Sequence, residues 1–295
     1  MICNDCPRRC GVDREKTVGA CGVPERFVVA RAAKHFWEEP PISGTNGSGT
    51  VFFSGCNLKC IFCQNQKISR GCFGKEVSDD ALMRIFDRLI ESGAHNLNLV
   101  SPTHYARRLA RVLAQYRSPV PVVWNSGGYE SVETLQRLEG LVDIYLPDLK
   151  YVNAERSAKY AGAADYFPAA AAALREMRRQ QPQDVFENGL LQRGMIVRHL
   201  ILPKNTNQSI AALQWLKETF GPSLCVSLMA QYVPCGDLLK TPELQRPITA
   251  REYDKVAAAL DELGFETVFL QQREAADAAY IPPFDLTGVA DMEDT

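Results

Sequence analysis

The chain has 295 residues, a net charge of −2 and an apolar fraction of 46%. Its charge offers no large basic field, which argues against a nucleic-acid partner, and no apolar run approaches the length of a membrane span. The N-terminus lacks a secretory pattern, so we expect a cytoplasmic protein without a membrane partner. In that reducing compartment, ten cysteines predict metal or redox chemistry rather than disulfides.

Four cysteines lie near the N-terminus with the spacing Cys-x2-Cys-x3-Cys-x10-Cys. They are Cys3, Cys6, Cys10 and Cys21. Four thiolates in so short a segment can close a tetrahedral zinc site or hold a second iron–sulfur cluster that relays electrons. The sequence leaves both interpretations open. Free surface thiols are the third alternative, which we favour least because exposed thiols invite oxidation.

A second group, Cys56, Cys60 and Cys63, has the spacing Cys-x3-Cys-x2-Cys and directly follows an apolar run that predicts a strand. Ordinary iron–sulfur clusters take four cysteines. Three thiolates on one loop therefore leave one iron open, as catalytic metal sites keep an open position while structural sites are closed. An open iron can chelate a substrate. The alternatives are a structural zinc site or buried free thiols.

From residue 50 onward, strand-like and helix-like segments alternate. The expected strands are Thr50–Gly55, Asn96–Ser101, Val120–Ser126, Val142–Lys150, Met195–Leu202, Leu224–Tyr232 and a seventh candidate, Glu266–Gln271. The expected helices are Asp79–Ser92, Tyr105–Tyr116, Val132–Leu138, Pro168–Gln180, Gln208–Phe220 and Thr249–Leu263. This alternation predicts an α/β fold with a parallel sheet, although periodicity alone does not separate a partial barrel from an open doubly wound sheet. In either architecture, ligands bind at the carboxyl ends of the strands, where the three-cysteine loop also lies.

Several blocks together give the chain a resemblance to the radical S-adenosylmethionine (SAM) superfamily, and within it to the PflX-like branch of the pyruvate formate-lyase activating enzyme family. The blocks are Cys6–Cys10, Glu38–Gly44, Cys56–Asn65, Asn96–His104, Trp124–Glu130, Val142–Tyr151, Val197–Pro203 and Leu228–Tyr232. The resemblance implies a partial (β/α)6 radical SAM barrel with a small Cys-rich N-terminal extension. We expect the extension and linker at 1–49, the barrel at 50–272 and a C-terminal tail at 273–295.

The resemblance also implies an activity. Cys56, Cys60 and Cys63 would ligate a [4Fe–4S] cluster whose open iron holds SAM, and the reduced cluster would cleave SAM to methionine and a 5′-deoxyadenosyl radical. An electron donor such as flavodoxin or ferredoxin would reduce the cluster. By family analogy the radical would activate a protein partner, a glycyl radical enzyme. The alternatives are modification of a peptide or small metabolite, or a non-catalytic iron–sulfur or zinc carrier.

Residues that match the family's motifs are expected to bind the cofactor. Phe62 would lie against the adenine of SAM. Asp148 and Lys150 match an Asp-Leu-Lys motif in which the lysine can meet the carboxylate of SAM and the aspartate can position it or bind a cation. Asn125 occupies a position where activating enzymes place a carboxylate, which weakens the expectation of a bound cation.

Two further strand ends supply candidates. Arg198 and His199 are adjacent on an expected strand, so their side chains point to opposite faces, and we favour Arg198 as a partner for a carboxylate. Gln231 and Tyr232 end the next strand and are expected near the adenine.

One departure from the family concerns the amino group of SAM. Many members have Gly-Gly-Glu after the second strand to bind this group, where this chain has Ser101-Pro-Thr103. Because proline has no N–H and no carboxylate is present, another acceptor is needed: Ser101, Thr103 or a backbone carbonyl.

Overall fold

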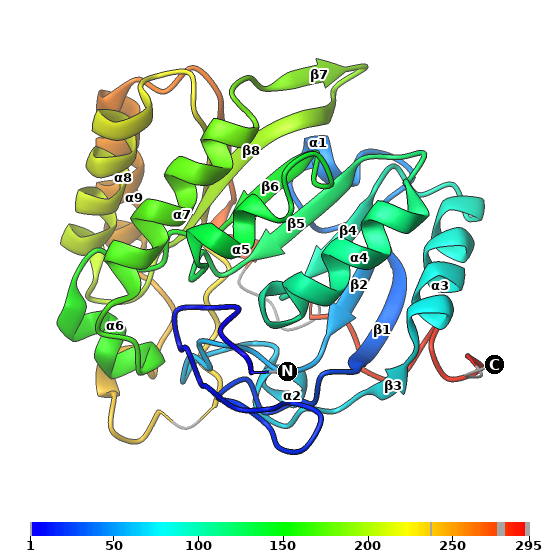
Figure 1. Ribbon diagram of the computed structural model, residues 1–295. Helices are drawn as coiled ribbons and strands as arrows, with labels where there is room; N and C mark the ends of the chain where they lie inside the picture. The colour runs from blue at the N-terminus through cyan, green and yellow to red at the C-terminus, as the bar shows by residue number, and fades with distance from the viewer. Residues whose placement is uncertain (1, 237, 276–280, 293–295) are drawn as a thin grey trace.

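The computed structural model describes residues 2–236, 238–275 and 281–292. Its strands form one sheet in the order β10-β9-β8-β6-β5-β4-β2-β1-β3, with β7 paired to β8 (Figure 1). The strands are β1 Phe27–His35, β2 Ser48–Phe53, β3 Lys75–Val77, β4 Leu97–Val100, β5 Val122–Ser126, β6 Ile144–Pro147, β7 Val185–Glu187, β8 Leu190–Leu200, β9 Cys225–Met229 and β10 Val268–Leu270. Neighbours along β2-β4-β5-β6-β8-β9-β10 are parallel, so the predicted α/β sheet is confirmed.

Longer helices cover one face of the sheet, and Figure 1 shows α3, α4, α5 and α7 side by side in front of it. The helices are α1 Pro40–Ser43, α2 Gln66–Ser69, α3 Asp79–Glu91, α4 Ala106–Tyr116, α5 Val132–Gln136, α6 Ala154–Ala161, α7 Tyr166–Gln180, α8 Thr206–Phe220 and α9 Ala250–Leu263. Helix α3 begins where the sequence predicts, because the Ser78 side chain accepts a hydrogen bond from the N–H of Ala81. Among the helices of the described residues, none has both the length and the apolar character needed to cross a bilayer.

The sheet is unclosed, and two segments outside the predicted alternation extend it. Strand β1 was not predicted; it lies inside the expected extension and pairs antiparallel with β2 and β3. The C-terminal segment then runs along β1, where Leu286 N–H donates to the Ala30 carbonyl (3.0 Å) and Ala32 N–H donates to the Thr287 carbonyl (2.9 Å). Both ends of the chain therefore support the strand that carries the three-cysteine loop.

Helix α1 packs against the inner face of the sheet, opposite the long helices. Its Ile42 is fully buried in a small apolar cluster formed by alternate strand residues, among them Val123, Ile144 and Ile196. Because side chains alternate along a strand, Asn125 and Arg198 point to this same face, nearer the carboxyl ends. The short helix thus fills the sheet's inner face below the site and holds the preceding residues, Glu38 and Glu39, close to it.

The N-terminal segment packs on the same end of the sheet through two arginines. Arg8 donates to the carbonyls of Asn57 (2.7 Å) and Ala161 (3.0 Å), which joins this segment to the cysteine loop and to the end of α6. Arg14 is buried; it donates to the carbonyls of Pro24 (2.5 Å) and His104 and lies over the ring of Tyr105. Charged donors to several carbonyls are among the stronger hydrogen bonds, so these arginines fix the segment against the barrel.

Candidate functional site

The three cysteines lie on the loop between β2 and α2 and line a cavity of about 250 Å³ at the carboxyl ends of the parallel strands. The loop is held from outside: Cys56 N–H donates to the Cys21 carbonyl (3.3 Å) and Ile61 N–H to the Tyr160 carbonyl (2.8 Å). The motif and the strand-end rule therefore place the site in the same position, as the sequence predicts.

Each of the three sulfurs accepts a hydrogen bond. Leu58 N–H donates to Cys56 Sγ (3.4 Å), Tyr151 Oη to Cys60 Sγ (3.7 Å) and Ser69 Oγ to Cys63 Sγ (3.4 Å). Donors of this kind stabilise thiolates and tune the potential of a metal centre bound to them. In the metal-free chain, burial raises the pKa of Cys60 to about 12, so a bound cation is needed to keep that sulfur ionised at neutral pH.

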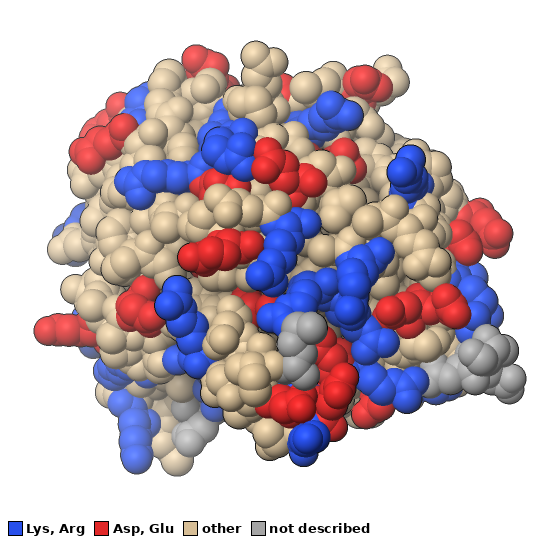
Figure 2. All heavy atoms as spheres, viewed as in Figure 1, with Lys and Arg blue, Asp and Glu red and all other residues tan. Residues whose placement is uncertain are grey.

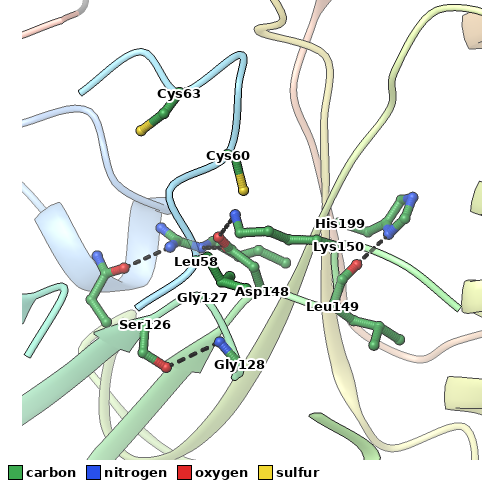
Figure 3. A network of polar contacts seen from close by, with 12 residues as sticks. Leu58, Cys60, Cys63, Ser126, Gly127, Gly128, Asp148, Leu149, Lys150 and His199 are labelled. Atoms are coloured by element: carbon green, nitrogen blue, oxygen red, sulfur yellow. Dashed lines mark hydrogen bonds and ion pairs between the residues drawn. The ribbon is translucent and has the colours of Figure 1, made fainter. Parts of the chain in front are cut away.

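A buried ion network crosses the cavity below the cysteines. Arg198 donates through Nε to Asp148 Oδ1 (2.8 Å), through Nη1 to Glu38 Oε2 (3.0 Å) and through Nη2 to Asn125 Oδ1 (2.6 Å). Lys150 pairs with the other oxygen of Asp148, and Figure 3 shows its amino group directed toward the Cys60 sulfur. Burial disfavours the charged form of Asp148, but the neighbouring cations Arg198 and Lys150 outweigh this effect. They hold the pKa of Asp148 below its ordinary value.

Glu38 is a member of this network that the sequence reading missed. It comes from the segment between β1 and α1, and its Oε1 accepts hydrogen bonds from Asn98 (3.2 Å) and Asn125 (3.1 Å). Its neighbour Glu39 is buried, and burial raises its pKa. The block Glu38–Gly44, one of those that carry the family resemblance, could have indicated this residue. The predicted strand ends did not include Glu38, because the first predicted strand begins at Thr50.

Most of the sequence-predicted residues meet at the cavity. Its lining includes Phe62, Ser101, Asn125, Asp148, Lys150, Arg198, Gln231 and Tyr232. Thr103 is not among these lining residues: its hydroxyl is buried and donates to Glu130 Oε1 (2.7 Å). Ser101, which adopts a positive φ of 57°, is thus the predicted amino-group acceptor that the cavity exposes.

His199 lies on the opposite side of β8 from Arg198, as the alternation predicts. Its Nδ1 is 2.6 Å from the Leu149 carbonyl, and Figure 3 shows the ring pointing away from the cysteines. Burial lowers its pKa to about 4, so the ring is neutral at physiological pH. This histidine therefore belongs to the packing behind the sheet rather than to the cavity.

Glu130 is a buried carboxyl group outside the cavity lining, bonded to residues of two neighbouring segments. Its Oε1 accepts hydrogen bonds from Thr103 (2.7 Å) and Trp124 Nε1 (3.2 Å), and burial raises its pKa. Since the folded state then binds this proton more tightly, the group favours folding at low pH and costs stability as pH rises through its folded pKa. We expect Glu130→Gln to lose less stability than wild type as pH rises above the ordinary glutamate pKa of 4.5.

The test is urea unfolding followed by fluorescence at several pH values. Glu130→Ala serves as the comparison, because it leaves two buried donors without an acceptor and should cost about 1–3 kcal/mol at low pH, where the wild-type carboxyl is protonated. Identical pH profiles for Glu130→Gln and wild type would contradict the assignment.

The family model described as the radical SAM superfamily matches residues 50–230, which is more than half of the chain. The chain belongs to the radical SAM superfamily. The matched residues run from β2 to just beyond β9, so they include the three-cysteine loop and most of the strand ends that line the cavity.

Individual relatives are more distant. The uncharacterized protein MJ0674 of Methanocaldococcus jannaschii is 27% identical over 278 residues, covering 90% of this chain and 76% of that protein. Streptococcus suis SuiB bound to its precursor peptide SuiA has a TM-score of 0.50 at 10% identity, covering 74% of this chain and 46% of that chain. The FeFe-hydrogenase maturase HydG from Carboxydothermus hydrogenoformans has a TM-score of 0.50 at 15% identity, covering 76% and 53%. The chain spans about half the length of these structures, whose likeness supports the partial-barrel fold alone.

Membership in the radical SAM superfamily implies a [4Fe–4S] cluster and SAM, and the cysteine loop fits such a cluster. Within the described residues, no three Cys, His, Asp or Glu side chains gather closely enough to hold one metal ion. The three thiols lie on one loop and line the cavity, as thiolates that hold an iron–sulfur cluster beside an open substrate position would.

The N-terminal cysteines of this radical SAM protein are packed close to that loop. Cys3, Cys6 and Cys21 are buried, while Cys10 is half-buried and its Sγ accepts a hydrogen bond from Ala20 N–H (3.3 Å). The Cys21 carbonyl contacts the cluster loop directly through Cys56. A metal at these four cysteines remains a prediction.

Proposed function

We propose that this chain is a radical SAM enzyme that uses Cys56, Cys60 and Cys63 to hold a [4Fe–4S] cluster and cleaves SAM reductively. When bound, the cluster supplies the electron that converts SAM to methionine and a 5′-deoxyadenosyl radical. The observation that carries the proposal is the cavity itself, which has three hydrogen-bonded sulfurs on one wall and a cation, Lys150, directed toward them. A non-catalytic carrier has no use for such a cavity.

The cavity-lining residues supply the contacts that SAM requires. Lys150, held by Asp148, offers an ammonium group to the carboxylate of SAM. Ser101 and the Glu38 carboxylate are the acceptors that the cavity offers to its amino group. The ring of Phe62, packed edge-on against Tyr232 with centroids 5.8 Å apart, supplies an apolar wall for the adenine.

We further propose that the radical abstracts hydrogen from a protein glycine, by analogy with the pyruvate formate-lyase activating enzyme family that the chain resembles. The sequence blocks listed above support this assignment by analogy. An acidic flavodoxin or ferredoxin would supply the electron. The alternative is that the radical modifies a peptide or a small metabolite.

The test is anaerobic reconstitution with iron and sulfide, reduction with dithionite, and addition of SAM. We expect 5′-deoxyadenosine by liquid chromatography. With pyruvate formate-lyase added as a probe, we expect a glycyl-radical signal by electron paramagnetic resonance. Recovery of SAM unchanged from a fully loaded protein would reject the enzyme assignment, whereas 5′-deoxyadenosine without the glycyl signal would reject only this substrate.

A further inference from the structure

A basic groove lies on the outer side of the cysteine loop, opposite the SAM cavity. Four cations line it, Arg8, Lys59, Arg70 and Lys159, and its lining contains no carboxylate. Leu58 lines both this groove and the cavity, so the cysteine loop is the wall that separates the two. A partner seated in this groove therefore contacts the cysteine loop from outside the SAM cavity.

Three of these cations form no ion pair with a carboxylate among the described residues. Lys159 pairs with Glu243 (2.5 Å), and Arg8 is occupied with the carbonyls of the loop and of α6. Lys59 and Arg70 form no ion pair with a carboxylate among the described residues. Arg70 instead donates a hydrogen bond to the backbone carbonyl of Lys59. This bond keeps the Arg70 guanidinium next to Lys59 in the lining of the groove.

Two basic side chains outside the groove, both on α4, form ion pairs. Figure 2 shows Lys and Arg side chains gathered over α4, but Arg107 there pairs with Asp5 and Arg108 with Asp79. Since the whole chain is slightly acidic, an unneutralised basic groove beside the cluster loop is a local exception. Such a patch steers an oppositely charged partner and orients it as it arrives.

We propose that this groove is the docking surface for a small acidic electron-transfer protein that reduces the cluster. The inference rests on the proposed function and names the partner that it needs. One electron leaves the reduced redox group of the donor and reaches the cluster held by Cys56, Cys60 and Cys63. The donor is oxidised by one electron and the cluster is reduced by one. Lys59 and Arg70 act by attracting and orienting the donor.

The experiment compares two reductants on the reconstituted full-length protein. Initial rates of 5′-deoxyadenosine formation are measured with dithionite and with reduced flavodoxin, the acidic protein used as probe, at low and high ionic strength. For Lys59→Gln/Arg70→Gln we expect the flavodoxin-driven rate at low salt to fall about 10-fold, while the dithionite-driven rate stays within twofold of wild type. Lys59→Glu/Arg70→Glu should lower the flavodoxin-driven rate further.

The matched control is Arg251→Gln/Lys255→Gln, which removes the same charge from α9. An equal loss in this control, an unchanged flavodoxin-driven rate in the groove variant, or an equal loss with dithionite would each overturn the docking proposal. Absence of 5′-deoxyadenosine from wild type with dithionite would overturn the proposed function instead. Flavodoxin binding, titrated without SAM, would then decide the docking: weaker binding to the groove variant alone supports it, and equal binding rejects it.

Discussion

Cys60→Ala is expected to lower the iron content of the reconstituted protein from about four atoms at this site to near zero and to reduce 5′-deoxyadenosine formation to background. Of the three cysteines, Cys60 alone is buried; its sulfur receives the Tyr151 hydroxyl, and Figure 3 shows the Lys150 amino group directed toward it. Two remaining thiolates leave two irons without a protein ligand, so the cluster is no longer held.

Iron analysis, absorbance near 400 nm and chromatography after reduction measure this result. Cys225→Ala is the matched control, because Cys225 is an equally buried thiol that lies in the apolar layer of β9 with its sulfur near Asp184. This control should keep both the cluster and the activity. A Cys60→Ala protein that still binds a full cluster and cleaves SAM would refute the ligand assignment.

Local sequence patterns were sufficient for the parallel sheet and the cysteine loop. Each parallel strand is a short apolar run, and the helices between them carry one apolar face, so both signals lie within a few residues. The family resemblance identified Asp148 and strand parity favoured Arg198, and the structure joins the two at 2.8 Å. The alternation of side chains along a strand was enough to predict that Arg198 and His199 lie on opposite faces of the sheet.

Contacts between segments that lie far apart in the sequence could not be predicted from these local patterns. Glu38 reaches the cavity because β1 adds to the edge of the sheet and α1 then turns onto its inner face, and neither step has a local periodic signature. Likewise, nothing near Arg8 in the sequence indicates that its guanidinium meets carbonyls more than 150 residues away. Thr103 was predicted from its position after a strand, but its side chain points to Glu130 rather than into the cavity.

Arg198→Met is expected to destabilise the protein by about 3–5 kcal/mol at pH 7, because it leaves Glu38 and Asp148 as buried carboxylates without their shared cation. All three side chains are about one-tenth exposed, so solvent screens the loss weakly. The double variant Glu38→Gln/Arg198→Met should recover part of this loss, since Glu38 is the carboxylate that Arg198→Met leaves without a cation, whereas Asp148 keeps Lys150. Arg246→Met, which breaks the more exposed pair with Glu252, should cost less than about 1 kcal/mol.

The pH dependence separates this ion network from simple loss of packing. In wild type the pKa of Asp148 is lowered, so its contribution to stability is present above the ordinary carboxyl pKa of about 3.9 and is lost as pH falls through the folded pKa. In Arg198→Met, Asp148 loses one of the two cations that lower its pKa, so it takes up a proton at a higher pH than in wild type. The deficit relative to wild type, measured by urea unfolding, should therefore shrink steadily between pH 7 and pH 4. A deficit of the same size across that range would mean that Arg198 stabilises the protein through packing of its aliphatic carbons. The ion pairs with Glu38 and Asp148 would then not be the source of its stabilising effect.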